Sequence, residues 1–431
     1  FYTQFFRLDW GLPSRARVEQ VMGSAENLAK WMPVMLEQRS KYYEIRGKLL
    51  DKDQPFRENY FALNKRWDVP VFSVLPQEIV LDRMRQYIIG VNVADEQVVL
   101  NSIKVIDPRK LRFSPDNMAH YGAIYYYITG AFLISGKIGG WLTLNPDVGY
   151  YFSHPDEVSR MYQTVRAVGG FATVGAVVAL FFMMKRFYGA GIALLSAMLL
   201  AAAPLTVPYS HLMKSHLLGM FFLAAGLYFC GRIIREDLEG RELRYYILSG
   251  IALGLCGGTI ITNITVGSLP VLAEWLRRDW RVRDTFKSRN MWISVLCFIV
   301  TFCICHFFIF LHFQEFRRLV RAMVEFYPSY YENRWYEWLP YLREFVLEQT
   351  DWSTLPLFLA GAWFAVRRRE KFMLLCLFAF GILFLQNIFT VRHAPVNARL
   401  LPAMAVLSAW VVFQLREYLP RFRSGVVVYA G

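Results

Sequence analysis

Residues 162–189 read YQTVRAVGGFATVGAVVALFFMMKRFYG, a long apolar run at about 162–184 followed by Lys185-Arg186-Phe187-Tyr188-Gly189. An apolar run of about 20 residues is long enough to cross a bilayer as a helix. Eight further apolar runs follow, at about 189–208, 216–234, 246–261, 263–276, 291–313, 353–366, 372–390 and 399–415. Several are shorter than a full span, so we expect broken or re-entrant segments near Pro204, Pro208 and Gly257-Gly258.

The composition agrees with a membrane protein. The 431 residues are 55% hydrophobic and 19% charged, with a mean hydropathy of +0.28, which excludes an ordinary soluble domain and a disordered chain. We predict an all-α integral membrane protein of about ten transmembrane helices, counting residues 1–10 as the end of a truncated first helix.

The net charge of +14 follows the predicted topology. Alternate gaps between the apolar runs are rich in Arg and Lys, whereas the opposite short gaps hold little more than Lys214 and Arg392. Cationic loops stay on the cytoplasmic side, so the charge indicates a membrane and no nucleic-acid partner. The cationic residues on that side are Lys185, Arg186, Arg232, Arg235, Arg241, Arg244, Arg277, Arg278, Arg281, Arg283, Lys287, Arg289, Arg367, Arg368, Arg369, Lys371, Arg416, Arg421 and Arg423.

Two polar regions are therefore expected outside the membrane. An insert at 11–161 precedes the multi-pass domain at 162–431, and a loop at 314–352 lies within that domain. The insert includes an aromatic segment at 120–132 that suits the membrane interface. The loop carries Tyr327, Tyr330, Tyr331, Trp335 and Trp338. These aromatic side chains fit either a cleft for sugars and lipid headgroups or an interfacial belt.

Cysteine and histidine spacing predicts no metal site and no cofactor. All six cysteines lie in apolar runs, where cysteine is typically a small core residue. His211 and His216 would point about 140° apart on one helix, which is poor for joint metal ligation. His306 and His312 lie in an apolar, Phe-rich run and are expected to pack between helices.

A series of short motifs occurs in one order along the chain. They are Gly11-Leu12-Pro13, Asp95-Glu96, Tyr125-Tyr126-Tyr127, an Arg166 that opens a helix, Lys185-Arg186-Phe187-Tyr188-Gly189, Ser210-His211 and Arg399-Leu400-Leu401-Pro402. In this order the sequence resembles the GT-C fold glycosyltransferases that use polyprenyl-phosphate sugars, near the protein mannosyltransferase and aminoarabinose transferase branch (glycosyltransferase family 39-like). The resemblance implies a GT-C-like helix bundle in a bacterial inner (plasma) membrane, with its site facing outside.

The resemblance also implies a reaction and its partners. A polyprenyl-monophosphate lipid would donate the sugar to a glycan, lipid or protein acceptor, by metal-independent inverting transfer. Asp95, with Glu96 beside it, matches the family's catalytic pair, and a carboxylate can take the acceptor's proton. From the residues alone, an acidic pair that begins a helix is the simpler reading. Asp156-Glu157 is the rival pair, because some members carry His-Pro-Asp-Glu in the catalytic loop.

Other residues are assigned by the same resemblance. Four cationic or imidazole side chains are expected to bind the donor phosphate, and arginine suits this because its planar donors bind two oxygens: Arg392, His393, Arg399 and Lys214. Four further residues are expected to contact substrate: Tyr121, Tyr125, His211 and His216. Arg166 is expected to be structural.

Two departures from the family pattern leave an alternative open. Many relatives have Asp where His216 stands, and Lys near Thr262-Asn263, where this chain has none. The alternative is a catalytically degenerate GT-C membrane scaffold or complex subunit that binds a protein partner through its external insert. A transporter is a third reading, but few ionisable residues lie mid-run and no paired halves are evident.

Overall fold

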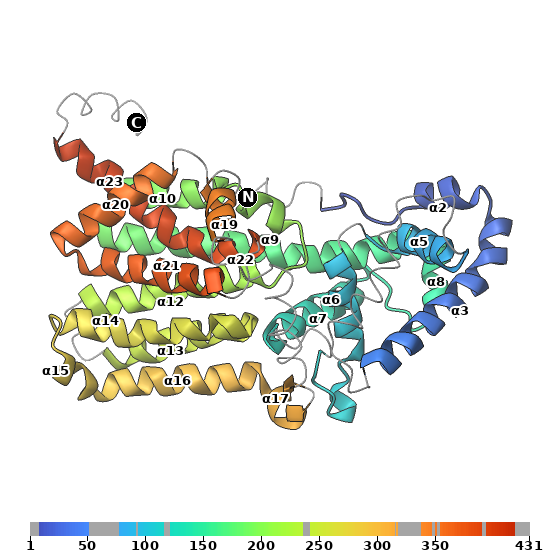
Figure 1. The fold of residues 1–431 in the computed structure, drawn as a ribbon, viewed down its shortest axis with the longest axis horizontal. Coiled ribbons are helices and arrows are strands. Elements are labelled where there is room, and N and C mark those ends of the chain that lie inside the picture. Colours follow the sequence, from blue (N-terminus) through green and yellow to red (C-terminus); the bar gives the residue numbers. More distant parts are fainter. Residues whose placement is uncertain are drawn as a thin grey trace.

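The described part of the chain is helical, with a bundle at one end and a smaller helical insert at the other (Figure 1). Within it only two isolated bridges pair extended residues, Asp107 with Arg112 and Tyr121 with Ile260. The structure is a computed structural model, and it describes residues 8–50, 77–91, 94–115, 121–235, 242–314, 316–317, 338–346, 350, 354–389 and 394–418.

The insert is built from short helices that precede the bundle: α2 (Arg15–Met22), α3 (Ala25–Leu50), α5 (Gln77–Ile89), α6 (Ala94–Val105), η2 (Pro108–Lys110), α7 (Ala123–Ile138) and α8 (Val148–Ser153). Helices α2, α3, α5 and α8 enclose a small core of their own. Its buried members are Met22, Met35, Leu81, Ile88 and Phe152. This part of the insert therefore has an apolar centre separate from that of the bundle.

The bundle begins with α9 and continues almost to the C-terminus. Its elements are α9 (Pro155–Tyr188), α10 (Ala190–Ala202), α11 (Thr206–Ser210), α12 (His216–Arg235), α13 (Glu242–Thr259), η4 (Ile261–Ser268), α14 (Leu269–Arg277), α15 (Val282–Phe286), α16 (Arg289–Cys305), α17 (Phe307–Leu311), α19 (Trp338–Glu344), α20 (Thr354–Arg368), α21 (Lys371–Phe389), α22 (Ala394–Asn397), η7 (Ala398–Leu400) and α23 (Leu401–Tyr418).

Four stretches of the described residues are long and apolar enough to cross a membrane, namely Pro155–Tyr188, His216–Arg235, Lys371–Ile388 and Ala398–Leu415. Helices α10 and α16 are apolar but shorter. The predicted class, an all-α multi-pass membrane protein, is confirmed. The total of about ten crossings stays a prediction.

Helix α9 corrects one expectation, because Arg166 does not open it. The helix begins at Pro155, whose fixed φ suits the first helical position, and Asp156 and Glu157 occupy its first turn. Arg166 therefore lies inside a 34-residue helix. Figure 1 shows α9 running from the insert into the bundle, so one rigid element joins both parts.

The breaks expected from proline and glycine are present. Helix α10 ends at Ala202, and α11 starts two residues beyond Pro204. Helix α13 ends at Thr259, and the chain continues as the 3₁₀ segment η4. At these breaks, short polar stretches of the chain face the interior of the bundle, at the end that lies toward the insert.

Helices α13 and α16 pack closely through a glycine face. A Cβ added at Gly250 would lie 2.3 Å from the Ser294 carbonyl oxygen, and one at Gly254 would lie 2.9 Å from the Phe298 carbonyl oxygen. Small residues are the usual means of bringing membrane helices together. The same device joins insert to bundle, because a Cβ at Gly122 would lie 1.6 Å from the Gly258 carbonyl oxygen.

Candidate functional site

A buried ion pair joins the insert to the bundle. Arg166 on α9 donates from Nε to Glu96 Oε1 at 2.9 Å and from Nη2 to Glu96 Oε2 at 2.7 Å. Both side chains are buried, at 1% and 0% exposure. The remaining guanidinium nitrogen, Nη1, donates to the carbonyl oxygens of Leu8 and Trp10, each at 2.8 Å. Arg166 therefore binds the N-terminal turn and α6 to the middle of α9, as its expected structural role requires.

Glu96 also holds the loop before α12. Its Oε1 accepts a hydrogen bond from the Met213 backbone N–H at 3.0 Å. That loop carries His211 and Lys214, and α12 begins with His216. The carboxylate thus fixes three of the predicted site residues against α6, and its lone pairs are used in doing so.

Asp95 precedes this anchor by one residue, in the first turn of α6. Its side chain lies outside the described residues. Glu96 is held in the core by three hydrogen bonds, two from Arg166 and one from Met213, so the backbone of Asp95 is fixed one residue before this anchor. The loop that carries Lys214 and leads to His216 is thus bonded to the residue that follows Asp95.

The rival pair lies elsewhere. Asp156 forms an exposed ion pair with Arg15 at 3.2 Å, and Glu157 bonds to Arg160 at 2.9 Å and to the Thr143 N–H at 2.6 Å. Ten residues separate Asp156 from Arg166 along α9, or about 15 Å at 1.5 Å per residue. The Asp156 carboxylate is thus remote from the Glu96 anchor.

Aromatic side chains pack around the loop before α12. His216, 4% exposed, lies edge to face with Tyr121 with ring centroids 5.9 Å apart. Tyr125 is 1% exposed, and burial together with the nearby Glu96 carboxylate raises its pKa well above the usual value. Its hydroxyl therefore stays protonated. Lys214 is buried, whereas His211 is half-buried.

A polar row continues from His216 into the bundle. One turn along α12, Gly219 lies so close to Thr259 that an added Cβ would be 2.8 Å from the Thr259 hydroxyl. Asn263 donates from Nδ2 to Thr259 Oγ1 at 3.2 Å and to the Cys256 carbonyl at 3.0 Å. Its Oδ1 is buried and has no hydrogen-bond partner among the described residues. Asn263 lies in the segment where the family resemblance leads us to expect a Lys.

Arg399 lies in a second buried network at the same end of the bundle. Its Nη2 donates to Asn387 Oδ1 at 2.9 Å, and its Nε donates to the Val396 carbonyl at 3.0 Å. Asn397 Oδ1 accepts from Asn387 Nδ2 at 2.8 Å and from Tyr341 Oη at 2.6 Å. Burial raises the pKa of Tyr341 to about 12, so the phenol remains a donor. These amides and this phenol were not predicted.

One atom of Arg399 is incompletely satisfied. Its Nη1 is buried and has no hydrogen-bond partner among the described residues. Leaving a buried charged donor unmatched costs free energy that an anionic ligand oxygen would recover. Arg392 and His393, predicted to act with it, lie outside the described residues. The aromatic loop residues Tyr327, Tyr330, Tyr331 and Trp335 and the side chain of Trp338 do so as well.

The two networks are connected through packed elements. Segment η7, which holds Arg399, packs against α12, the helix that begins with His216. Thr265 on η4 donates to Gln386 Oε1 at 2.7 Å, next to Asn387. The insert's anchor and the buried arginine thus belong to one polar region at the insert end of the bundle. Among the described residues, no three His, Cys, Asp or Glu side chains gather as metal ligands. Independence of metals and cofactors stays a prediction.

Comparisons with known proteins agree with this architecture. A family model described as dolichyl-phosphate-mannose-protein mannosyltransferase matches residues 161–308, about a third of the chain. The crystal structure of ArnT from Cupriavidus metallidurans in the apo state matches with a TM-score of 0.50 at 14% identity, over 73% of this chain and 54% of that one. The chain thus spans about half the length of the ArnT chain. No curated protein is matched.

Two further solved structures are similar with lower scores. ArnT bound to undecaprenyl phosphate matches with a TM-score of 0.47 at 13% identity, over 72% of this chain and 54% of that one. The Archaeoglobus fulgidus oligosaccharyltransferase complex with Zn and sulfate matches with a TM-score of 0.43 at 14% identity, over 72% of this chain and 43% of that one. The predicted resemblance is confirmed at the level of the fold: this chain is a GT-C fold membrane protein.

Proposed function

We propose that the protein is a membrane glycosyltransferase that moves a sugar from a polyprenyl-monophosphate donor to an acceptor. The reaction would take place at the outer face of a bacterial inner membrane. The observation that carries the proposal is the buried Glu96–Arg166 pair, because Glu96, the residue after Asp95, also accepts a hydrogen bond from the loop that holds Lys214 and leads to His216. The mannosyltransferase family model over residues 161–308 supports the same class of reaction.

The proposed chemistry divides between the two polar networks. An acceptor hydroxyl or amine attacks the sugar's anomeric carbon as the bond to the lipid phosphate breaks. Asp95 takes the acceptor's proton, and the departing phosphate carries the new negative charge. Arg399 Nη1 and Lys214 offset that charge. Phosphate leaves readily, so no strong general acid is required.

Glu96 would act as a positioning residue in this scheme. Both of its oxygens are occupied by Arg166, and one of them also accepts from Met213. These hydrogen bonds use the Glu96 carboxylate to hold α6, α9 and the loop before α12 together, and the proposal therefore gives the role of base to Asp95.

The test is transfer activity of Asp95→Asn in reconstituted vesicles, with Asp156→Asn as the matched control. Polyprenyl-phosphate mannose and polyprenyl-phosphate aminoarabinose would be the donors tried. Loss of a general base lowers kcat by a factor of about 10² to 10⁴. We expect that loss in Asp95→Asn, with an unchanged melting temperature, and near-normal kcat in Asp156→Asn. The reverse result would move the base to Asp156, and full activity of both variants would end the assignment.

A scaffold function is the second candidate, and the insert's own core favours it. Helices α2, α3, α5 and α8 pack around Met22, Met35 and Phe152, separately from the bundle core. An independently packed unit outside the membrane is suited to holding a protein partner. Copurification separates the two functions, because a stoichiometric protein partner without bound polyprenyl phosphate would favour the scaffold.

A further inference from the structure

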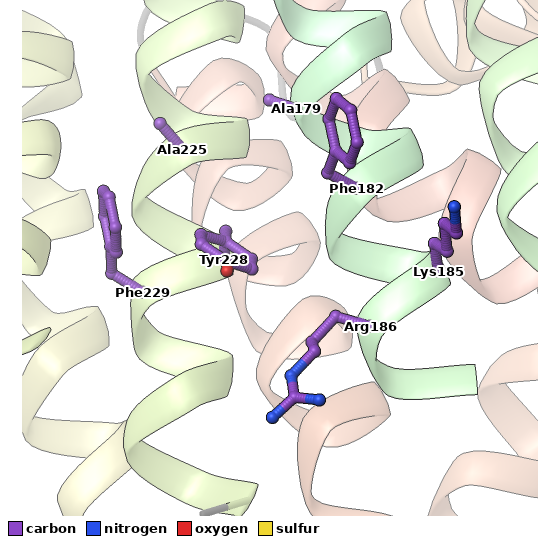
Figure 2. Close-up of a pocket in the computed structure, with 7 residues that line it drawn as sticks. All are labelled: Ala179, Phe182, Lys185, Arg186, Ala225, Tyr228 and Phe229. Carbon is purple, nitrogen blue, oxygen red and sulfur yellow. The ribbon is translucent and has the colours of Figure 1, made fainter. Parts of the chain in front are cut away.

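A lateral groove opens between α9 and α12, far from the site described above (Figure 2). Its volume is about 640 Å³, within the range of about 300 to 1,000 Å³ typical of small-molecule sites. It is lined by two basic residues and five apolar or aromatic ones: Ala179, Phe182, Lys185, Arg186, Ala225, Tyr228 and Phe229. About 20 residues of α9, or about 30 Å, separate its basic end from Arg166.

The groove exists because α9 and α12 contact each other on both sides of it along their length, whereas the residues between these two contacts are small. On one side, the Phe221 ring packs against Gly175, so closely that a Cβ added at Gly175 would lie 2.9 Å from the ring. On the other side, Phe187 stacks on Tyr228 with centroids 6.0 Å apart, and the ring of Phe187 also fills the space at Gly231. Between these contacts, Ala179 and Ala225 are too short to close the gap.

The charge and exposure of the lining define what the groove can hold. Lys185 and Arg186 are exposed, and none of the seven lining residues is a carboxylate. Phe182 is 59% exposed, so the groove opens sideways toward the lipid tails. Figure 2 shows the Arg186 side chain extending from α9 toward α12. Because α9 ends two residues later, at Tyr188, we expect the two cations at headgroup depth and the alanines at acyl-chain depth.

We propose that this groove binds an anionic phospholipid of the cytoplasmic leaflet. Its phosphate would lie on Arg186 and Lys185, and an acyl chain would lie over Ala179 and Ala225. Arginine binds phosphate oxygens through two donors at once, and basic pockets between membrane helices favour anionic headgroups. The proposal does not depend on the transfer reaction, since the candidate site lies at the opposite end of both helices.

The test counts lipids retained by the full chain. The protein is placed in bilayers of phosphatidylglycerol and phosphatidylcholine, extracted in mild detergent and examined by native mass spectrometry. We expect phosphatidylglycerol to be retained about tenfold over phosphatidylcholine, a factor consistent with two cations at the membrane surface. Lys185→Gln with Arg186→Gln should remove the preference. Arg367→Gln with Arg368→Gln, which removes the same charge elsewhere at this end, should keep it.

A second variant tests the groove without changing charge. Ala225→Phe fills the space between the helices and is expected to lower retention of phosphatidylglycerol to the level of phosphatidylcholine. Unchanged retention in Ala225→Phe would overturn the proposal, as would an equal loss in both double variants. Retention of added polyprenyl phosphate in place of phosphatidylglycerol would assign the groove to a different lipid and would also overturn it. Circular dichroism melting curves would verify that each variant is folded.

Discussion

At the scale of single residues, the Glu96–Arg166 pair explains how the site is held. The buried guanidinium of Arg166 donates four hydrogen bonds, two to the Glu96 carboxylate and one each to the carbonyl oxygens of Leu8 and Trp10. These bonds offset the cost of burying its charge. The same carboxylate fixes the loop before α12 through Met213. One side chain therefore sets the positions of the insert, the loop and α9.

Removing one partner of this pair should destabilise the fold. Glu96→Gln leaves a buried guanidinium without a countercharge, and we expect a loss of about 3 to 5 kcal/mol in the free energy of unfolding. The exposed Arg15–Asp156 pair is the control, and Arg15→Met should cost no more than about 1 kcal/mol. Thermal unfolding in detergent, followed by tryptophan fluorescence, makes the comparison.

A double variant checks that the loss comes from the unpaired charge. Glu96→Met combined with Arg166→Met removes both charges, and we expect it to cost less than the two single changes added together. Strict additivity of the two losses would show that these residues act independently, contrary to the geometry.

At the scale of elements, close helix contacts depend on glycine where a backbone oxygen faces the helix. The face of α13 toward α16 contains Gly250 and Gly254, and both lie within van der Waals contact of α16 atoms. Gly258, one turn further along α13, packs directly against Gly122 of the insert. These contacts determine how closely the insert packs against α13, just before η4.

The glycine face gives a paired prediction. In Gly254→Ala the new Cβ would lie 2.6 Å from Thr301 Cβ, so α13 and α16 must separate, and we expect a loss of about 1 to 3 kcal/mol. In Gly381→Ala on α21 the Cβ meets nothing within 4 Å, and we expect no loss or a gain of about 0.5 kcal/mol. Melting temperatures would measure both, and equal shifts would contradict the packing described.

The sequence patterns predicted which helices are present more accurately than the residues at which each helix begins and ends. The apolar run at 216–234 matches α12 closely, because its boundaries coincide with the polar loop before it and the Arg-rich gap after it. The run at 162–184 gave no signal that α9 begins at Pro155, since the first turns of α9 lie outside the apolar stretch. A helix that continues beyond its apolar part is set by tertiary contacts, here with the insert.

The candidate site could be predicted only in part. Asp95 is named by a motif, and Lys214 and His216 are named by the family resemblance. The structure bonds Glu96, which follows Asp95, to Met213 in the loop before His216. The other members of the Arg399 network, Asn387, Asn397 and Tyr341, carry no motif, because neutral amides and a phenol are common in any helix. Their pairing depends on how α19, α21 and η7 meet, which local sequence does not encode.

At the scale of the whole molecule, the charge distribution predicts orientation. The end of the bundle near α15 carries Arg281 and Arg283, whereas the insert lies at the other end (Figure 1). The positive-inside rule assigns the basic end to the cytoplasm. The candidate site and the lipid groove would then face opposite leaflets.

Cysteine labelling of intact cells tests that orientation. We expect Arg109→Cys in the insert to react with a membrane-impermeant maleimide from outside, and Arg283→Cys on α15 to react only after the cells are opened. Both positions are exposed, and four of the six native cysteines are buried. The unmodified protein provides the background. Labelling of Arg283→Cys in intact cells would reverse the orientation.

The most direct test of the central claim is native mass spectrometry of the purified chain with added polyprenyl monophosphate. The account predicts a bound lipid of that mass, retained by the unmodified protein and by Lys185→Gln with Arg186→Gln. In Arg399→Leu the lipid should be retained at least about tenfold less, because the buried guanidinium would no longer meet the phosphate. Absence of any bound lipid, or equal retention by Arg399→Leu, would contradict the account.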